Sequence, residues 1–186
     1  MTFNWHEVWE RKGNSMTTDL KELDGYESTN IEPQKVAEQI SKILEISKHD
    51  KILEVGCGSG MLAQYLECDY VGIDYSKSLV KKHIKLLGNS VLHGYANDLV
   101  FKDNSFDKVF AFSVFHYFPD GVYADRVINE MKRVARQKVF IGDLPFKSKR
   151  PEHLLFKKEE FIDFEITEGF YNQDRFNVLR NCIPKV

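Results

Sequence analysis

The chain has 186 residues, of which 42% are hydrophobic and 13% aromatic, and its formal net charge is −2. This length suits one domain with a single filled core, and this composition argues against intrinsic disorder. Duplex binding needs a surplus of positive charge, so we expect no nucleic-acid partner. No apolar run approaches the roughly 20 residues that cross a bilayer, so we expect no membrane partner.

The N-terminus and the cysteines indicate the cellular compartment. Residues 1–7 lack the basic start and the apolar centre of a signal peptide. The three cysteines, Cys57, Cys68 and Cys182, lie far apart and include no Cys-x-x-Cys pair. They fit neither a disulfide framework nor a zinc site. We therefore expect a cytoplasmic chain without a metal, and the sequence does not indicate its oligomeric state.

The first 50 residues are expected to be helical. Residues 1–30 hold both tryptophans, Trp5 and Trp9, and we expect them to form a short helical cover over residues 31–186 rather than a separate domain. A helix is expected to begin at Pro33, because proline suits the first position of a helix. Its apolar residues lie on one face and would pack on a sheet: Val36, Ile40, Ile43 and Leu44.

From residue 51 onward, short apolar strands alternate with helical patterns. Strands are expected at residues 51–55, 70–74, 90–93, 107–112 and 138–142. Helices are expected at 61–66, at 77–87 after the cap Ser76, and around 127–134. Such alternation predicts an α/β fold with a mostly parallel sheet covered on both faces. Residues 162–171 and 175–183 flank a polar turn and predict a C-terminal antiparallel hairpin.

The most informative segment is Leu-Glu-Val-Gly-Cys-Gly-Ser-Gly at residues 53–60, where a buried strand runs into three alternating glycines. Glycine lets the backbone turn sharply and lets a ligand approach the main chain. The next strand ends in Asp74, and an acid there accepts hydrogen bonds from both hydroxyls of a ribose. Together, loop and acid predict a ligand that contains a nucleoside, rather than a tight turn without a ligand.

Two ligand classes fit such a loop, the nicotinamide dinucleotides and S-adenosylmethionine. A dinucleotide fingerprint that begins at Gly56 wants glycine or alanine where this chain has Met61. A fingerprint that begins at Gly58 starts two residues too late after the strand. The dinucleotide interpretation, which would make the chain a hydride-transfer dehydrogenase, is therefore the poorer fit.

Four segments resemble class I S-adenosylmethionine-dependent methyltransferases. Residues 53–60 resemble the first motif of that family and Gly-Ile-Asp-Tyr-Ser at 72–76 the second. Residues 94–107 resemble the third motif with the run into the fourth strand, and 113–118 resemble the segment after it. The resemblance covers about residues 33–142. It implies a Rossmann-like, seven-stranded, mostly parallel sheet, which agrees with the predicted hairpin.

The resemblance also implies where the cofactor, S-adenosylmethionine, would bind. The glycines would lie under its methionine part with Glu54 near the amino group, Asp74 would hold the ribose, and Tyr75 would cover the adenine. Many relatives carry an acid where this chain has Tyr95, so Asn97 or Asp98 would have to replace that contact. The implied cofactor residues are Glu54, Gly56, Cys57, Gly58, Gly60, Asp74, Tyr75, Ala96, Asn97, Asp98, Phe112 and Ser113.

Methyl transfer to oxygen or nitrogen often needs a base, and histidine is the usual one near neutral pH. His116 follows the fourth strand, and the carboxyl ends of parallel strands build the sites of such sheets. A base at this position predicts that His116→Ala lowers turnover by about 100-fold, whereas a packing role predicts little change. Tyr117 is a candidate for orienting the acceptor, and Asp143 lies at the end of the fifth strand. Each of the two has an alternative structural role, in packing or in capping.

The acceptor is suggested by two features. The basic run at 147–150 follows the fifth strand and would favour a phosphate or carboxylate group if it folds over the pocket; otherwise it is a solvated loop. The N-terminal cover resembles small bacterial methyltransferases of surface-polysaccharide modification, at Trp-x-Arg-x-Gly (9–13) and Asp-Gly-Tyr (24–26). The candidate acceptor residues are Tyr26, Lys147, Lys149 and Arg150.

These observations predict a small-molecule methyltransferase, with O-methylation of a phosphorylated or sugar-containing precursor preferred. An N-methyltransferase for a small amine is the first alternative. The second is a protein that binds S-adenosylmethionine without catalysis, as a partner subunit. Preference for S-adenosylhomocysteine over NAD would separate all three from a dehydrogenase.

Overall fold

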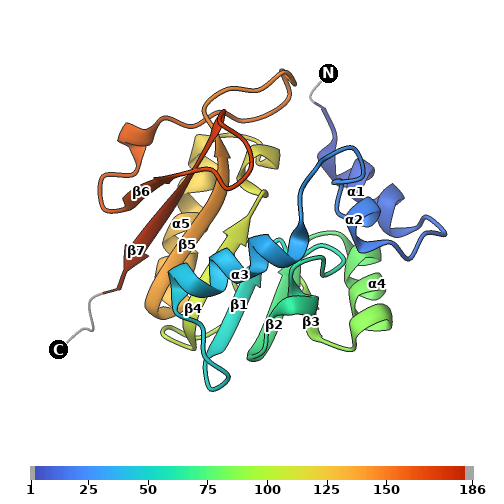
Figure 1. The fold of residues 1–186 in the computed structure, drawn as a ribbon, viewed down its shortest axis with the longest axis horizontal. Coiled ribbons are helices and arrows are strands. Elements are labelled where there is room, and N and C mark those ends of the chain that lie inside the picture. The colour runs from blue at the N-terminus through green and yellow to red at the C-terminus, as the bar shows by residue number, and fades with distance from the viewer. Residues whose placement is uncertain (1–2, 183–186) are drawn as a thin grey trace.

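A single seven-stranded sheet organises the computed structural model, which describes residues 3–182 (Figure 1). Its strands are β1 (Lys51–Val55), β2 (Asp69–Asp74), β3 (Ser90–His93), β4 (Phe106–Phe112), β5 (Ala135–Pro145), β6 (Glu165–Glu168) and β7 (Arg175–Asn181). The α-helices are α1 (Trp5–Gly13), α2 (Leu20–Leu23), α3 (Pro33–Leu44), α4 (Lys77–Leu87) and α5 (Gly121–Val134).

The strand order is β3-β2-β1-β4-β5-β7-β6. The first five strands pair in parallel, whereas β7 pairs antiparallel to both β5 and β6. The predicted Rossmann-like sheet with a C-terminal hairpin is thereby confirmed. The predicted last strand also included Ile183, which lies outside the described residues.

The central strands are buried on both faces, as expected for a parallel sheet between helices. Successive side chains of a strand point to opposite faces. On β4, Val109 and Ala111 therefore pack with α5, whereas Phe110 and Phe112 pack with α3. In Figure 1, α3 crosses the front of the sheet and α5 lies behind it. Two apolar layers thus hold the sheet in place. The edge at the carboxyl ends of its parallel strands remains available for a binding site.

Local capping explains where two of the helices begin and end. Pro33 is the first residue of α3, where its missing N–H costs nothing. Ser76 Oγ accepts from the Leu79 N–H and starts α4, and Gly88 ends it in the left-handed conformation (φ +71°). Both helices were predicted from these residues, and both predictions are confirmed.

The helix predicted at 61–66 is not formed, and this prediction was wrong. The segment contains only a 3₁₀ turn, η1 (Ala63–Tyr65), after which Leu66 is extended. Met61 and Leu62 are buried in one apolar cluster and Ala63 in another. A helix with one apolar face cannot fill both clusters, so packing decides against it.

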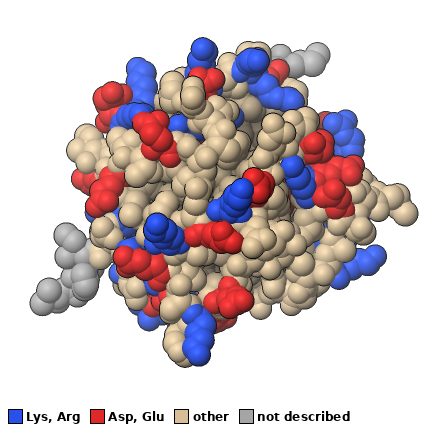
Figure 2. Space-filling model, viewed as in Figure 1, with Lys and Arg blue, Asp and Glu red and all other residues tan. Residues whose placement is uncertain are grey.

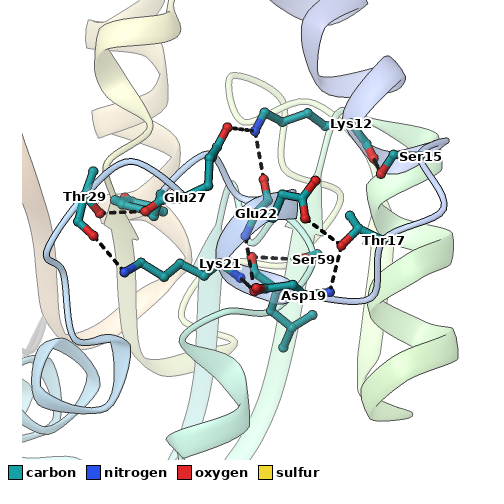
Figure 3. A network of polar contacts seen from close by, with 11 residues as sticks. Lys12, Ser15, Thr17, Asp19, Lys21, Glu22, Glu27, Thr29 and Ser59 are labelled. Carbon is teal, nitrogen blue, oxygen red and sulfur yellow. Dashed lines mark hydrogen bonds and ion pairs between the residues drawn. The ribbon is translucent and has the colours of Figure 1, made fainter.

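Residues 3–30 form the N-terminal cover, which contains α1 and α2. Helix α1 packs on α4, and Trp9 and Leu23 are buried against Leu79. Figure 3 shows the polar network inside the cover, including the ion pair of Lys12 with Glu27 at 2.9 Å. The same network reaches Ser59, whose Oγ lies 3.5 Å from the carbonyl oxygen of Leu20 (Figure 3). The cover is therefore attached to the loop after β1.

Lysine and arginine side chains alternate with acidic ones on the face shown in Figure 2, without a patch of one sign. This mixture agrees with the small net charge of −2. Within residues 3–182, no helix is long and apolar enough to cross a bilayer.

Candidate functional site

A cavity of about 430 Å³ opens at the carboxyl ends of β1, β2 and β4. Its floor is the loop after β1, its sides follow β2 and β4, and the N-terminal cover forms a further wall through His6, Trp9 and Tyr26. This volume lies in the range of small-molecule sites, about 300–1,000 Å³. The carboxyl edge of the sheet is also where a ligand is expected in such a fold.

The floor is the glycine loop, residues 56–60, and its backbone demands glycine. Gly56, Gly58 and Gly60 have φ values of +75°, +52° and +96°, in the left-handed region. A Cβ on Gly56 would lie 2.5 Å from Val114 Cγ2, and one on Gly58 would lie 2.4 Å from Asp24 Oδ1. The loop thus runs close beneath residues that line the cavity. Larger side chains would push it out of place.

Three carboxyl groups line the cavity, those of Glu54 and Asp74 buried and that of Asp24 half-buried, and we call Asp24, Glu54 and Asp74 the acidic cluster. Asp74 accepts from the Gly58 N–H at 2.9 Å and from the Ser76 N–H at 2.8 Å, so its side chain points toward the glycine loop. The Tyr70 hydroxyl donates to Glu54. Burial raises the pKa of Asp24 to about 7 and that of Glu54 to about 8, and it also raises the pKa of Asp74.

The acidic cluster has no cationic partner within the described residues. None of its members forms an ion pair with lysine or arginine, and His6 is the only basic side chain among those lining the cavity. Burial disfavours such negative charge unless a positive charge approaches. The site therefore favours a ligand that carries positive charge.

S-adenosylmethionine fits these groups. Its sulfonium and ammonium supply the positive charge, and its ribose diol matches an acid at the end of β2. Aromatic side chains line the wall next to the acidic cluster: His6, Trp9, Tyr75, Tyr95, Tyr117 and Tyr123. Aromatic faces accept both a purine ring and a sulfonium cation. The acids, the glycine loop and the aromatic wall thus match the three parts of this cofactor.

A second polar group, the Asp143 cluster, lies at the ends of β4 and β5. Ser113 lines the cavity, and its Oγ donates to Asp143 Oδ2 at 2.6 Å. The backbone of Ser113 and that of Asp143 adopt the left-handed conformation, with φ values of +58° and +64°. Such strain is held only where the surroundings enforce it, and it gathers at functional sites. Arg175 Nη1 lies 3.8 Å from Asp143 Oδ2, and Asn177 Oδ1 accepts from the Asp143 N–H.

His116 belongs to the same cluster and lies behind the cavity wall. Its side chain is only 2% exposed and does not line the cavity. Its Nδ1 lies 3.3 Å from Arg175 Nη1, and because a guanidinium can only donate, Nδ1 is the acceptor. Burial, followed by the charge of Arg175, lowers the pKa of His116 well below its usual range. A neutral imidazole bonded in this way has no free lone pair for a substrate proton.

The cavity brings together many of the residues predicted from the sequence. It is lined by Tyr26, Glu54, Gly56, Cys57, Gly58, Asp74, Tyr75, Ala96, Phe112, Ser113 and Tyr117. Others lie outside its lining, namely Gly60, Asn97, Asp98, His116, Asp143, Lys147, Lys149 and Arg150. Gly60 ends the loop whose earlier residues line the cavity, and a Cβ there would lie 2.7 Å from His83 Nε2. Asp98 is exposed, whereas Ala96 and Tyr95 line the cavity.

Sequence reasoning missed Asp24 as part of the site, although it lies next to the predicted Tyr26. Nothing in the local pattern distinguishes an acid that reaches the glycine loop from one that caps a turn. Val114, Phe118, Pro119 and Tyr123 were also missed. They lie next to predicted positions after β4, and their contribution depends on how η2 (Phe115–Tyr117) turns the chain.

Comparison with known proteins agrees with this geometry. Residues 53–141 match the family model described as a methyltransferase domain. A phthiotriol/phenolphthiotriol dimycocerosates methyltransferase of Mycobacterium tuberculosis is 33% identical over 111 residues. The match takes in 55% of this chain and 39% of that relative, so the chain spans less than half of the relative's length.

Solved structures share the fold at low sequence identity. A SAM-dependent methyltransferase of Methanosarcina mazei has a TM-score of 0.67 at 18% identity, over 79% of this chain and 98% of that one. Magnesium protoporphyrin IX methyltransferase of Synechocystis PCC 6803, solved with bound SAH, has a TM-score of 0.65 at 14% identity, over 96% and 94% of the two chains. The matched domain at residues 53–141, the sheet and the acidic cavity together support a class I S-adenosylmethionine-dependent methyltransferase.

Proposed function

We propose that this chain transfers the methyl group of S-adenosylmethionine to an oxygen atom of a small acceptor. One observation carries the proposal: a single cavity is lined both by the acidic cluster and by Ser113, which is bonded to Asp143. The first feature suits a cationic methyl donor. The second suits an acceptor that has to lose a proton.

The cofactor residues follow from the lining of the cavity. Asp74 would hold the ribose hydroxyls, Glu54 would face the ammonium group, and Tyr75 would cover the adenine. When bound, S-adenosylmethionine supplies an activated methyl group, so the protein mainly has to position the acceptor and exclude water. The aromatic wall of Trp9 and Tyr26, which are buried, and Tyr117, which is half-buried, would provide that exclusion.

Proton removal is assigned to Ser113 and Asp143. Ser113 Oγ donates a hydrogen bond to Asp143, so it can accept one in turn from an acceptor hydroxyl in the cavity. The acceptor proton would pass to Ser113 and the serine proton to Asp143, whose pKa is raised by burial. The new O–CH₃ bond forms as the S–CH₃ bond breaks and its electron pair returns to sulfur. Asp143 is thus a base that acts through Ser113, and His116 supports it through Arg175.

A phosphorylated or sugar-containing acceptor is the preferred class. Phe118 and Pro119 line both the cavity and a second hollow, which Trp5, Pro151 and Glu152 also line. Two residues that line the second hollow, Pro151 and Glu152, directly follow the exposed basic run 147–150 in the chain. Cationic side chains there would attract a phosphate that extends from the cavity.

A panel of acceptors tests the proposal. The protein is incubated with S-adenosylmethionine and with phosphorylated sugars, free sugars, other small alcohols or small amines, and S-adenosylhomocysteine is measured. We expect release only with hydroxyl-bearing acceptors, and at least a 100-fold slower rate for Asp143→Asn, the usual scale for a lost base. Asparagine tolerates the left-handed backbone of this position, so the variant keeps its shape. Release with amines alone would favour N-methylation, and cofactor binding without any release would favour a non-catalytic partner subunit.

A further inference from the structure

The glycine loop lacks the support that an α-helix would give it. The residues after the loop form only the η1 turn, so the Ser59 and Met61 N–H groups have no helix of their own to order them. Backbone donors at such a place need an acceptor if they are buried. In this chain the acceptor comes from a distant segment.

Asp24 supplies that acceptor from the N-terminal cover. Its Oδ1 accepts from the Ser59 N–H at 2.6 Å, and its Oδ2 accepts from the Met61 N–H at 3.0 Å. Bonds of this kind to a carboxylate are roughly twice as strong as neutral ones. The absent Cβ of Gly58 leaves the room that the carboxylate occupies, since a Cβ there would lie 2.4 Å from Oδ1. The glycine loop and the Asp24 carboxylate are therefore complementary in shape.

The loop is held from its other side by α4. His83 Nδ1 lies 3.2 Å from the Gly58 carbonyl oxygen and donates to it, since a carbonyl only accepts. Burial lowers the pKa of His83 to about 4, so this ring is neutral and stays in place across the physiological range. Asp24 is thus the half of the clamp that titrates near neutral pH, whereas His83 does not.

Asp24 also lines the cavity, which makes it more than an anchor for the cover. It stands beside Glu54 and Asp74: the charge of Asp74 adds to the rise in the pKa of Asp24, and the charges of Asp24 and Asp74 add to the rise in the pKa of Glu54. Leu23, the residue before it, is fully buried against Trp9 and Leu79 and fixes its position. The cover therefore reaches the cofactor site through one side chain that is set by its own packing.

We propose that Asp24 is a positioning residue that replaces the missing helix: it holds the glycine loop in its cofactor-binding shape and couples docking of the N-terminal cover to cofactor binding. The proposal rests on the proposed function, because it assumes that the loop binds S-adenosylmethionine. Linkage makes the coupling reciprocal, so that cofactor binding must tighten the cover as much as the cover tightens cofactor binding.

The test measures S-adenosylhomocysteine binding by calorimetry, together with the melting temperature without ligand. Asp24→Asn keeps the volume but removes the charge, and places an amide donor against the Ser59 or Met61 N–H group. We expect it to raise the Kd at least tenfold. The matched control is Glu10→Gln, because Glu10 also ties the cover to the body, through Ser76 Oγ at 3.0 Å, without touching the loop. It should lower the melting temperature similarly, but because Asp24 still holds the glycine loop it should change the Kd less than twofold.

A measurement on the wild-type protein covers the case in which Asp24→Asn does not fold. Amide exchange of Leu23 and Asp24, whose N–H groups bond within the cover, should slow at least tenfold when S-adenosylhomocysteine saturates the protein. Unchanged exchange, or an equal Kd for Asp24→Asn and wild type, would overturn the role of Asp24. If wild type itself does not bind S-adenosylhomocysteine, the proposed function fails instead.

Discussion

The acidic cluster and the Asp143 cluster lie at the same edge of one sheet, yet their charges are balanced differently. Asp143 has Arg175 at 3.8 Å, Ser113 at 2.6 Å and Asn177 on its backbone. Asp24 and Asp74 accept from backbone N–H groups of the glycine loop and its neighbours, and none of the acidic cluster pairs with a lysine or arginine among the described residues. Glu54, Asp74 and Asp143 are all buried, so burial alone does not explain the difference.

The difference teaches what each cluster is for. A buried acid with an arginine is complete without a ligand, and it holds neighbouring groups in place or takes a proton. A buried acid without a cation costs free energy that a cationic ligand recovers on binding. The proposed role of the acidic cluster is therefore to select the cationic methyl donor, and that of the Asp143 cluster is to remove a proton from the acceptor. Substitutions that exchange these properties test the distinction.

The largest effect is expected from Arg175→Met. It leaves Asp143 and His116 buried without the guanidinium, and breaking a buried charge pair costs about 3 kcal/mol of the free energy of unfolding. Urea unfolding measures this loss, and the Kd of S-adenosylhomocysteine should stay within threefold. Arg180→Met is the control, because Arg180 lies on the same strand but pairs with Asp163 at the surface, which is worth less than about 1 kcal/mol. Equal losses in both variants would remove the special status of the Asp143 cluster.

Asp74→Asn should have the next largest effect, on binding rather than on stability. It removes the charge and leaves one acceptor oxygen for the Gly58 N–H, the Ser76 N–H and the predicted ribose contact together, so we expect a Kd for S-adenosylhomocysteine at least 100-fold higher. Calorimetry measures the change. Asp69→Asn is the matched control at the exposed start of the same strand and should leave the Kd unaltered. A Kd within fivefold of wild type for Asp74→Asn would contradict the cofactor site.

The acidic cluster also predicts how the ligand-free protein responds to pH. A carboxyl whose pKa is raised by folding binds its proton more tightly in the folded chain, so unfolding releases protons and stability falls as pH rises above about 4. The fall ends near pH 7 for Asp24 and pH 8 for Glu54. Cys57 and Tyr70 stay neutral throughout, because burial raises the pKa of both.

The cationic donor should show the opposite trend. Ionised acids attract its sulfonium and ammonium, so the affinity for S-adenosylmethionine should rise about tenfold between pH 6 and pH 8. Melting curves and calorimetry across this range measure both trends. Asp107 and Asp120 lie outside the acidic cluster. Asp107→Asn and Asp120→Asn should therefore leave the pH dependence of both the melting temperature and the affinity unchanged. Affinity that is flat with pH would mean that the cluster stays neutral when the donor binds.

The sequence predicted the features that local patterns determine. The sheet follows from apolar strands that alternate with capped helices such as α4, and the glycine loop with Asp74 follows from a motif. It did not predict Asp24 on the Ser59 and Met61 amides, because this contact joins residues more than 30 positions apart. It also placed a helix at 61–66, since the split of that segment between two apolar clusters is a tertiary property.

The smallest effect is expected from His116→Asn, which sharpens the comparison within the Asp143 cluster. The position after β4 favoured His116 as a base, and a base would cost about 100-fold in turnover when lost. In the structure, His116 Nδ1 accepts a hydrogen bond from Arg175, and the ring lies outside the cavity. The side-chain carbonyl of an asparagine would still accept from Arg175. We therefore expect turnover within fivefold of wild type with an unchanged Kd for S-adenosylhomocysteine, measured once an acceptor is known. His116→Phe removes that acceptor and should cost stability but no more turnover. A 100-fold loss of turnover in both variants would mean that His116 takes the proton of the acceptor and that Asp143 only supports it.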